Sequence, residues 1–125
     1  MALQVELVSP ERILYSGEAD MVIARTVGGG DIAFLPGHAP FVGALEIATV
    51  TLRTAQGDEL VAVHGGFVEV SNDTVTILSD VAELAKDIDV SRAQRAKEQA
   101  GGDDDEAVEA RKRADARLNA ANRAS

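Results

Sequence analysis

The residues of this sequence that could carry out chemistry are few. The chain of 125 residues has no cysteine and only two histidines, His38 and His64. Neither histidine has a serine or a carboxylate at a spacing that suggests nucleophilic catalysis. Two histidines so far apart are also a weak set of metal ligands. We therefore predict no catalytic residue, no metal site and no required cofactor, and we expect that the protein is not an enzyme by itself.

The acidic run Asp103-Asp104-Asp105-Glu106 is the other group that could attract a cation. A calcium loop needs oxygen ligands at alternating positions and a closing glutamate at a defined spacing, and the run has neither. Carboxylates are also favourable in the first turn of a helix, where they interact with the helix dipole. We therefore predict that this run begins a helix.

The composition argues against several classes of function. The net charge of −9 disfavours nonspecific binding to nucleic acid or to an anionic lipid surface. No apolar stretch approaches the roughly 20 residues of a membrane-spanning helix, and the first residues do not resemble a secretory signal. We expect no nucleic-acid partner and no direct membrane insertion. Residues 1–86 contain 12 acidic and 4 basic residues against 9 and 8 in residues 87–125, which indicates a boundary near residue 86.

The first two thirds of the chain read as short strands. Apolar and polar residues alternate, the period of a strand with one buried face, and turn residues such as Gly28–Asp31 and Gln56–Asp58 separate the segments. Strands at this spacing predict a β-sandwich or barrel. The expected strands are Leu3–Leu7, Met21–Ala24, Ile32–Leu35, Leu45–Thr54, Leu60–Val63, Phe67–Val70 and Val75–Leu78.

The last third is rich in alanine and predicts two helices. Asp89 or Ser91 caps the first, which runs to about Ala100, and Gly101-Gly102 ends it. The second presents an apolar face at helical spacing. That face consists of Ala107, Ala110, Ala114, Leu118 and Ala121. A buried methyl group contributes on the order of 1 kcal/mol, so an alanine interface is weak and we expect a hairpin that detaches easily.

We therefore expect two parts: an antiparallel β-sandwich in residues 1–85 and an α-helical hairpin in residues 88–124. Within the first part, the segment Pro36-Gly37-His38-Ala39-Pro40 predicts a rigid turn after a strand, with His38 exposed at its tip. His64 lies in a strand before Gly65-Gly66 and is expected to be a packed or edge residue.

Three segments resemble one protein family. GDIAFLPGHAP at residues 30–40 is similar to a signature usually read as GEIGILPGHAP, and SPERILYSGEAD at 9–20 and VHGGFVEVSNDTVTILSD at 63–80 resemble the flanking family segments. By these motifs, in this order, roughly residues 2–85 resemble the epsilon subunit of F-type ATP synthases, a family with a two-helix C-terminal part. Ala33 and Phe34 replace the usual Gly and Ile, and a triple glycine lengthens the preceding turn.

The resemblance implies a non-catalytic subunit of the central stalk. Its β-sandwich would bind the gamma subunit and touch the c-ring, at the cytoplasmic face of a bacterial plasma membrane and peripheral to it. The residues assigned to these partners are Gly29, Gly30, Asp31, Pro36, Gly37, His38 and Pro40. The helices would extend toward the alpha and beta subunits and inhibit ATP hydrolysis, with the Arg111-Lys112-Arg113 cluster pairing with acidic surfaces there.

The segment Ile88-Asp89-Val90-Ser91-Arg92-Ala93 has two interpretations. It is a helix start capped by Asp89, or it is the motif with which some epsilon subunits bind regulatory ATP. In the second case Asp89 would hold the adenine edge, Ile88 and Ala93 would pack on the base, and Arg92 would meet the phosphates, as a guanidinium suits phosphate oxygens. Basic residues of the second helix would assist. The candidates are Arg113, Arg117 and Arg123.

A rival from another class is a free-standing module that senses a nucleotide through the same motif and needs no rotor partner. No Walker-type loop is present, so both interpretations predict binding without hydrolysis.

Overall fold

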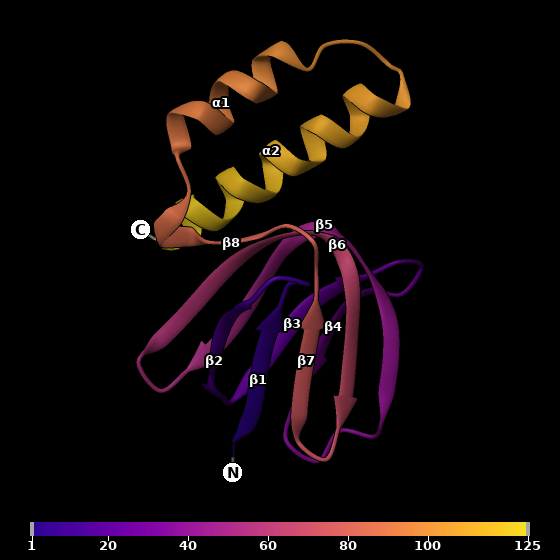
Figure 1. Cartoon of the computed structure of the whole chain (residues 1–125), viewed down its shortest axis with the longest axis vertical. Helices are drawn as coiled ribbons and strands as arrows, with labels where there is room; N and C mark the ends of the chain where they lie inside the picture. Colours follow the sequence, from indigo (N-terminus) through magenta and orange to yellow (C-terminus); the bar gives the residue numbers. More distant parts are fainter. Residues whose placement is uncertain (1, 125) are drawn as a thin grey trace.

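The computed structural model describes residues 2–124 of the chain and contains eight strands (Figure 1). Strands form where apolar and polar side chains alternate along the sequence. In β1 every second residue is buried, as the sequence pattern predicts. The strands are β1 (Leu3–Val8), β2 (Ile13–Ala19), β3 (Met21–Thr26), β4 (Gly30–Phe34), β5 (Phe41–Thr54), β6 (Gly57–Ser71), β7 (Thr74–Leu78) and β8 (Ala82–Leu84).

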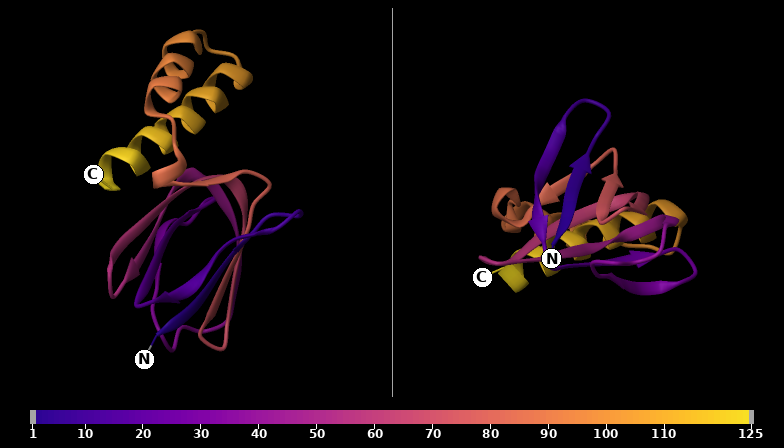
Figure 2. Two further views of the ribbon diagram at one scale, coloured as in Figure 1. Left: turned by 60° about the vertical axis from the view of Figure 1, so that its left-hand side comes forward. Right: turned by 90° about the horizontal axis from the view of Figure 1, so that it is seen from below.

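The strands pair in the order β2-β1-β7-β6-β5-β3-β4, and β8 pairs with β6. Two long strands, β5 and β6, pair along their whole length and are shared by both layers of the sandwich (Figure 2). The strands predicted at Leu60–Val63 and Phe67–Val70 are therefore two halves of β6. The predicted β-sandwich is confirmed, with one correction: β1 and β7 run parallel. Their pairing joins segments far apart in sequence, which local alternation cannot reveal.

The core of the sandwich is aliphatic apart from Phe34, in keeping with the low aromatic content. It lies between the two layers and includes no residue after Leu84. Its buried members are Leu3, Val5, Leu7, Ala19, Val22, Ala24, Phe34, Leu45, Val50, Leu52, Val61, Val63, Val68, Val70, Val75 and Ile77. The sandwich therefore has a hydrophobic core of its own.

A bend in β6 at Gly65-Gly66 lets this strand serve both layers. Both glycines have a positive φ, 84° and 130°. A Cβ on Gly66 would lie 2.1 Å from the carbonyl oxygen of Leu78, which is too close for any side chain, whereas a Cβ on Gly65 would meet nothing closer than 3.9 Å. The hydroxyl of Ser79 donates to the carbonyl of Gly65 at 2.8 Å and fixes the bend.

The C-terminal part is a short 3-10 turn, η1 (Ala85–Asp87), followed by α1 (Val90–Gln99) and α2 (Asp105–Ala124). Asp89 caps α1, because its carboxylate accepts a hydrogen bond from the backbone N–H of Arg92 at 3.0 Å. The helix α2 packs on β5 and β6, and α1 packs on α2 (Figure 1). None of the helices in residues 2–124 is long and apolar enough to cross a membrane.

The apolar face of α2 is wider than the sequence predicts. Ala107 and Ala114 are buried as expected, and Leu118 is half-buried. Two alanines outside the predicted face, Ala116 and Ala120, are buried as well. The helix contacts α1 and the sheet at once, so a single predicted stripe describes only part of its packing.

We predict that Gly66→Ala destabilises the protein by more than about 3 kcal/mol, because it adds a steric overlap to an unfavourable φ. The matched control is Gly65→Ala, whose cost comes from φ alone and should be about 1–2 kcal/mol. Urea unfolding followed by circular dichroism measures both. Equal losses for the two variants would contradict this account of the bend.

Candidate functional site

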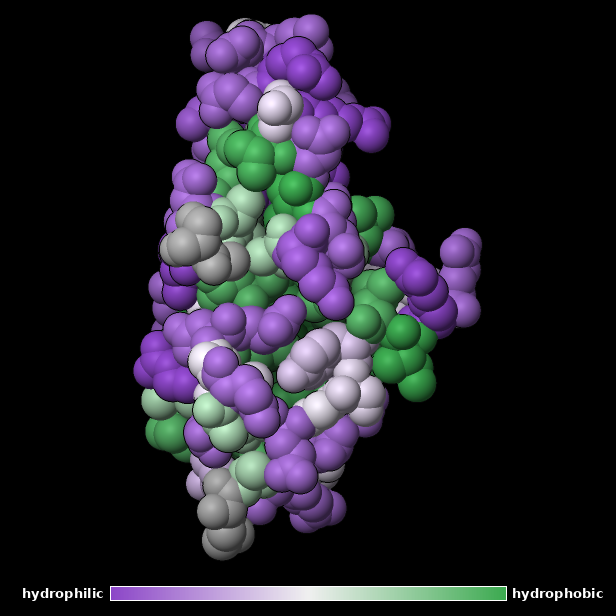
Figure 3. All heavy atoms as spheres, turned by 90° about the vertical axis from the view of Figure 1, so that its left-hand side faces the viewer, coloured by the Kyte–Doolittle hydropathy of each residue, from purple (hydrophilic) through white to green (hydrophobic). Residues whose placement is uncertain are grey.

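The docking interface, formed by Ala116 and Ala120 of α2 against Leu60 and Ala62 of β6, joins the two parts of the chain. Ile47, Ala85 and Ile88 surround it and are partly buried. Viewed from the side of Figure 3, the far end of the hairpin is mostly hydrophilic, and apolar side chains gather between it and the sandwich. Two alanine methyl groups against one leucine bury little apolar area, so the apolar contribution is on the order of a few kcal/mol.

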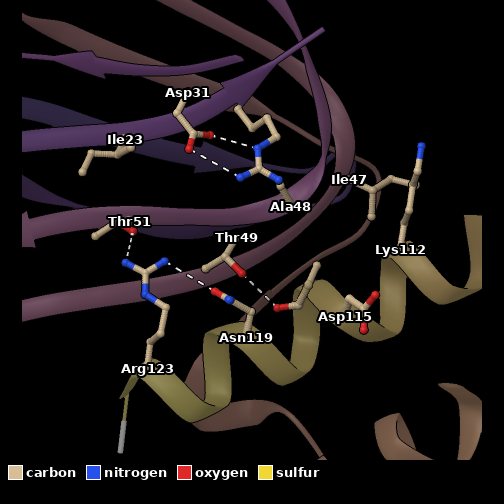
Figure 4. Close-up of a pocket in the computed structure, with 12 residues that line it drawn as sticks. Ile23, Asp31, Ile47, Ala48, Thr49, Thr51, Lys112, Asp115, Asn119 and Arg123 are labelled. Carbon is tan, nitrogen blue, oxygen red and sulfur yellow. Dashed lines mark hydrogen bonds and ion pairs between the residues drawn. The ribbon is translucent and has the colours of Figure 1, made fainter.

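Short alanine side chains let the backbone of α2 approach the sheet closely enough for polar contacts (Figure 4). The hydroxyl of Thr49 donates to the backbone carbonyl of Ala116 at 3.0 Å. Near the end of α2, the guanidinium of Arg123 donates to the hydroxyl of Thr51 at 2.9 Å. These bonds supplement the weak apolar contact and fix the position of α2 along β5.

A polar network that we call the latch also crosses the interface: it consists of His64 of β6, Glu83 of β8 and Arg117 of α2. One carboxylate oxygen of Glu83 accepts from Nε of Arg117 at 2.5 Å and from Nε2 of His64 at 3.1 Å. Burial alone would raise the pKa of Glu83, but the hydrogen bonds from Arg117 and His64 outweigh it and lower that pKa. Glu83 therefore stays ionised and ties the helix to the sheet.

The tautomer of His64 follows from its partner. An ionised carboxylate only accepts hydrogen bonds, so Nε2 carries the proton and Nδ1 of the neutral ring is an acceptor. Nδ1 is buried and has no hydrogen-bond partner among the described residues. Burial lowers the pKa of His64 and Arg117 lowers it further, while the bond to Glu83 works in the opposite direction. The sequence predicts a packed or edge residue at this position, and the side chain of His64 is packed.

A cleft of about 330 Å³, the motif cleft, lies where α1 begins, against α2. It brings together four of the residues proposed for nucleotide binding: Asp89, Arg92, Ala93 and Arg117. The complete lining is Glu83, Asp87, Asp89, Arg92, Ala93, Ala96 and Arg117. Glu83 has no place in the sequence motif and was missed; only the fold of β8 against α2 places it here.

Three residues proposed for the same role lie elsewhere. Arg123 donates to Thr51 of β5, near the end of α2. Ile88 packs beside the docking interface. Arg113 faces Glu106 at 3.7 Å and Glu109 at 3.9 Å, along its own helix. In the docked hairpin the motif cleft thus contains two arginines, Arg92 and Arg117. Arg117 already donates to Glu83, so an anion that binds in the cleft competes with Glu83 for Arg117.

A second cleft, of about 420 Å³, lies between α2 and the outer face of β3, β4 and β5 (Figure 4). Asp31, a residue proposed to contact a partner, lies at its edge in an ion pair with Arg25 at 3.0 Å. Both side chains are more than half exposed, so this pair contributes little to stability. The residues of α2 that line it are Lys112, Asp115, Ala116, Asn119 and Arg123.

The two turns proposed for partner binding lie at opposite ends of β4. Gly29 is in the turn before the strand, Gly30 and Asp31 are its first two residues, and the turn Pro36–Pro40 follows it. The second turn is tied to the β6–β7 turn, because the backbone N–H of Gly37 donates to Asp73 at 2.7 Å.

His38 differs from the exposed tip residue that the sequence predicts. Its ring is half-buried and packs edge-on against Phe34 and Phe41, with ring centroids 5.1 and 6.4 Å apart. Its Nδ1 also lies 2.7 Å from the carbonyl oxygen of Ala39. The histidine thus stabilises the turn and closes one end of the sandwich.

An apolar row crosses the outer face of five strands. Successive register partners point to the same face of a sheet, and Ile13, Val8, Leu78, Phe67 and Ala44 form such a series from β2 to β5. Ile13, Leu78 and Phe67 are 63%, 49% and 58% exposed. Contiguous exposed apolar side chains indicate a surface that a partner covers. Local patterns did not predict this row, because it depends on the register of strands far apart in sequence.

Residues 2–85 match the family described as the beta-sandwich domain of the ATP synthase delta/epsilon chain. Over 119 residues the sequence is 50% identical to the ATP synthase epsilon chain of Streptomyces griseus, which covers 94% of each chain. Over 100 residues it is 52% identical to the ATP synthase epsilon chain of Brevibacillus brevis, which covers 78% of this chain and 74% of that one.

Two solved structures have a similar fold. A chain of the Euglena gracilis mitochondrial ATP synthase, from a structure of OSCP, F1 and the c-ring, aligns with a TM-score of 0.72 at 20% identity, over 97% of this chain and 78% of that one. A chain from the central stalk and c-ring of the Tetrahymena thermophila mitochondrial enzyme aligns with a TM-score of 0.61 at 19% identity, over 99% and 96%.

We predict that Arg117→Ala weakens the docking of α2 by about 1–2 kcal/mol, because it removes a charge-assisted hydrogen bond to a half-buried carboxylate. The control is Arg113→Ala, whose ion pairs lie within α2 and should contribute only a few tenths of a kcal/mol. Amide hydrogen exchange along α2 measures both variants. A larger loss of protection in Arg113→Ala would show that the latch does not hold the helix.

Proposed function

Because this chain belongs to the delta/epsilon family of ATP synthase subunits, we propose that it is the epsilon subunit in the central stalk of a proton-translocating F-type ATP synthase. The observation that carries this proposal is the 50% identity to a curated epsilon chain over 94% of both sequences. In this role the chain makes and breaks no bond itself. It couples the gamma subunit to the c-ring and regulates ATP hydrolysis, as a peripheral protein at the cytoplasmic face of the bacterial plasma membrane.

The apolar row is the surface that we assign to the gamma subunit. A rotor subunit must transmit torque, so it needs a stable contact, and exposed Ile13, Leu78 and Phe67 offer apolar area that binding would bury. The segments Gly29–Asp31 and Pro36–Pro40 lie at opposite ends of β4, and we assign both to contacts with the rotor. The c-ring is the second partner of the sandwich in this proposal.

The hairpin is the regulatory part. Its contact with the sandwich combines a small apolar interface with a few polar bonds, so a docked and an extended state can differ by only a few kcal/mol. Extended, the helices would reach the alpha and beta subunits and inhibit hydrolysis. Of the basic cluster proposed to act there, Arg111 donates to the carbonyls of Ala100 and Gly102 in the docked hairpin, so extension with the hairpin opened frees this side chain.

We predict that a chain ending at residue 87 still joins the stalk and that the assembled enzyme then hydrolyses ATP faster. The sandwich core includes no residue beyond Leu84, so the fragment should fold. Hydrolysis rates of enzyme assembled with the full and the shortened chain measure the effect. The shortened chain must first show a cooperative unfolding transition and copurify with the gamma subunit; unchanged hydrolysis under those conditions would sink the inhibitory role.

Regulatory ATP is the ligand that we propose for the motif cleft. Asp89, Arg92, Ala93 and Arg117 line it together, although they come from two helices. A phosphate group would interact with the guanidinium groups of Arg92 and Arg117. Bound ATP would then bridge α1 and α2 and favour the compact hairpin.

We predict that ATP at about 1 mM shifts the NMR resonances of Asp89 and Arg92, and that Arg92→Ala weakens binding about tenfold by removing one charge-assisted contact. Arg95→Ala is the matched control, since Arg95 lies on the same helix, is exposed and does not line the cleft. Isothermal titration of the three proteins gives their affinities. Equal affinities in all three, or no shift at millimolar ATP, would end the nucleotide proposal.

Copurification separates this function from the rival one. A free-standing nucleotide sensor would bind ATP in the motif cleft but would not copurify with subunits of the ATP synthase. The identity to curated epsilon chains and the apolar row both favour the rotor subunit.

A further inference from the structure

We propose that the latch of His64, Glu83 and Arg117 is sensitive to protons: it holds the hairpin on the sandwich while His64 is neutral and weakens when His64 takes up a proton. The inference concerns docking in the isolated chain. It does not depend on nucleotide binding or on assembly with a rotor, so its failure would leave the proposed function intact.

The position of His64 is the first step. Its side chain is only 3% exposed, although it belongs to a strand at the boundary between the sandwich and the hairpin. Glu83 connects it to Arg117, and the three residues come from β6, β8 and α2. A change at His64 is therefore transmitted through one carboxylate to the helix that carries the hairpin.

The second step is where an added proton would go. Nε2 already donates to Glu83, so a proton can bind only at Nδ1, which is buried and has no partner among residues 2–124. The ring would then carry a charged donor without an acceptor. It would also bring a positive charge near Arg117 and Arg113, both on α2. Attraction to Glu83 opposes these costs, but Glu83 is shared with Arg117.

Undocking relieves each of these costs. When α2 leaves, its two arginines move away and water reaches the imidazole ring. The charged groups around the latch come from several elements, and the β5 residue paired with His64 in register is the uncharged Ile47. These groups are Glu83 on β8, Arg113 and Arg117 on α2, Asp80 before β8, and Asp87, Asp89 and Arg92 beside the motif cleft.

The direction in which docking depends on pH follows from the two groups of the latch that titrate, His64 and Glu83. Burial and the arginines hold the pKa of His64 below its ordinary 6.5 in the docked state. Docking is therefore at full strength above about pH 6.5 and weakens as the pH falls below that value. The pKa of Glu83 is lowered from 4.5, so its contribution is also lost on acidification, but at lower pH. Both groups act in the same direction.

Spin labels placed across the interface test the proposal. The chain contains no cysteine, so Gln56→Cys and Gln99→Cys give two unique labels, one in the turn between β5 and β6 and one at the end of α1. Their distance distribution reports the docked fraction of the full-length chain between pH 7.5 and 5.5. We expect the docking equilibrium constant to fall with pH, by at most about tenfold per pH unit for one proton.

His64→Gln keeps an N–H donor for Glu83 but does not titrate, so its docking should not change over this range. His38→Gln is the matched control, because His38 is the only other histidine in the sequence and its ring packs against Phe34 and Phe41 of the sandwich; it should behave as the parent does. A parent with equal docking at pH 7.5 and 5.5, or a His64→Gln variant with the pH dependence of the parent, would overturn the proposal.

NMR titration of the His64 imidazole provides a second measurement. If His64 only packed in the interface, its pKa would not respond to a substitution at Arg117. The parent should show His64 titrating below 6.5, and Arg117→Gln should shift this titration upward, because the substitution removes a nearby positive charge and opens the site to water. An unchanged His64 titration in Arg117→Gln would show that His64 and α2 are not coupled, and this result would contradict the proposal.

Discussion

The contact between α2 and the sheet is the constraint on which the arrangement of this molecule depends, because it holds the hairpin on the sandwich. It is built from small residues: Ala116 and Ala120 bring the helix backbone close enough for Thr49 to reach a helical carbonyl. Larger side chains would bury more apolar area but would keep the backbone away from this hydroxyl. The small residues thus reduce the apolar stabilisation of the interface, but they allow a hydrogen bond that fixes where α2 lies along β5. A contact of this kind is specific and weak, which suits a part that must move.

The sandwich has the opposite character. Its core is continuous, mostly aliphatic and built from residues that precede the hairpin. The long strands β5 and β6 connect both layers, and the bend at Gly65-Gly66 makes this possible where Gly66 passes the backbone of Leu78. A rigid unit with an exposed apolar row is suited to a permanent partner, whereas the hairpin is suited to reversible contact. The two roles of the proposed function thus correspond to two kinds of packing.

Glu83 and Arg117 belong to both regulatory features proposed for this chain. They form the latch with His64, and they also line the motif cleft with Asp89 and Arg92. Docking, proton uptake and occupation of the cleft by an anion therefore involve one ion pair. An anion that draws Arg117 away from Glu83 leaves that carboxylate to His64 alone, which stabilises a protonated ring. Ligand and proton are consequently linked through a shared partner.

The sequence by itself determined most of the strands, the helix boundary at Gly101-Gly102 and the family, since each depends on neighbours in the chain: alternation, a turn or a contiguous motif. It did not predict β2 or β8 as strands, and it left the cap of α1 open between Asp89 and Ser91, where the structure has Asp89. It also predicted that His64 is a packed or edge residue of a strand, and the side chain is packed. It could not determine the parallel pairing of β1 with β7, the apolar row, or the fact that Ala116 and Ala120 face the sheet. Nor could it bring Glu83 to Arg117. These features depend on strand register and on how a helix rests on a sheet, and only the complete tertiary structure sets those distances, because the residues involved are far apart along the chain.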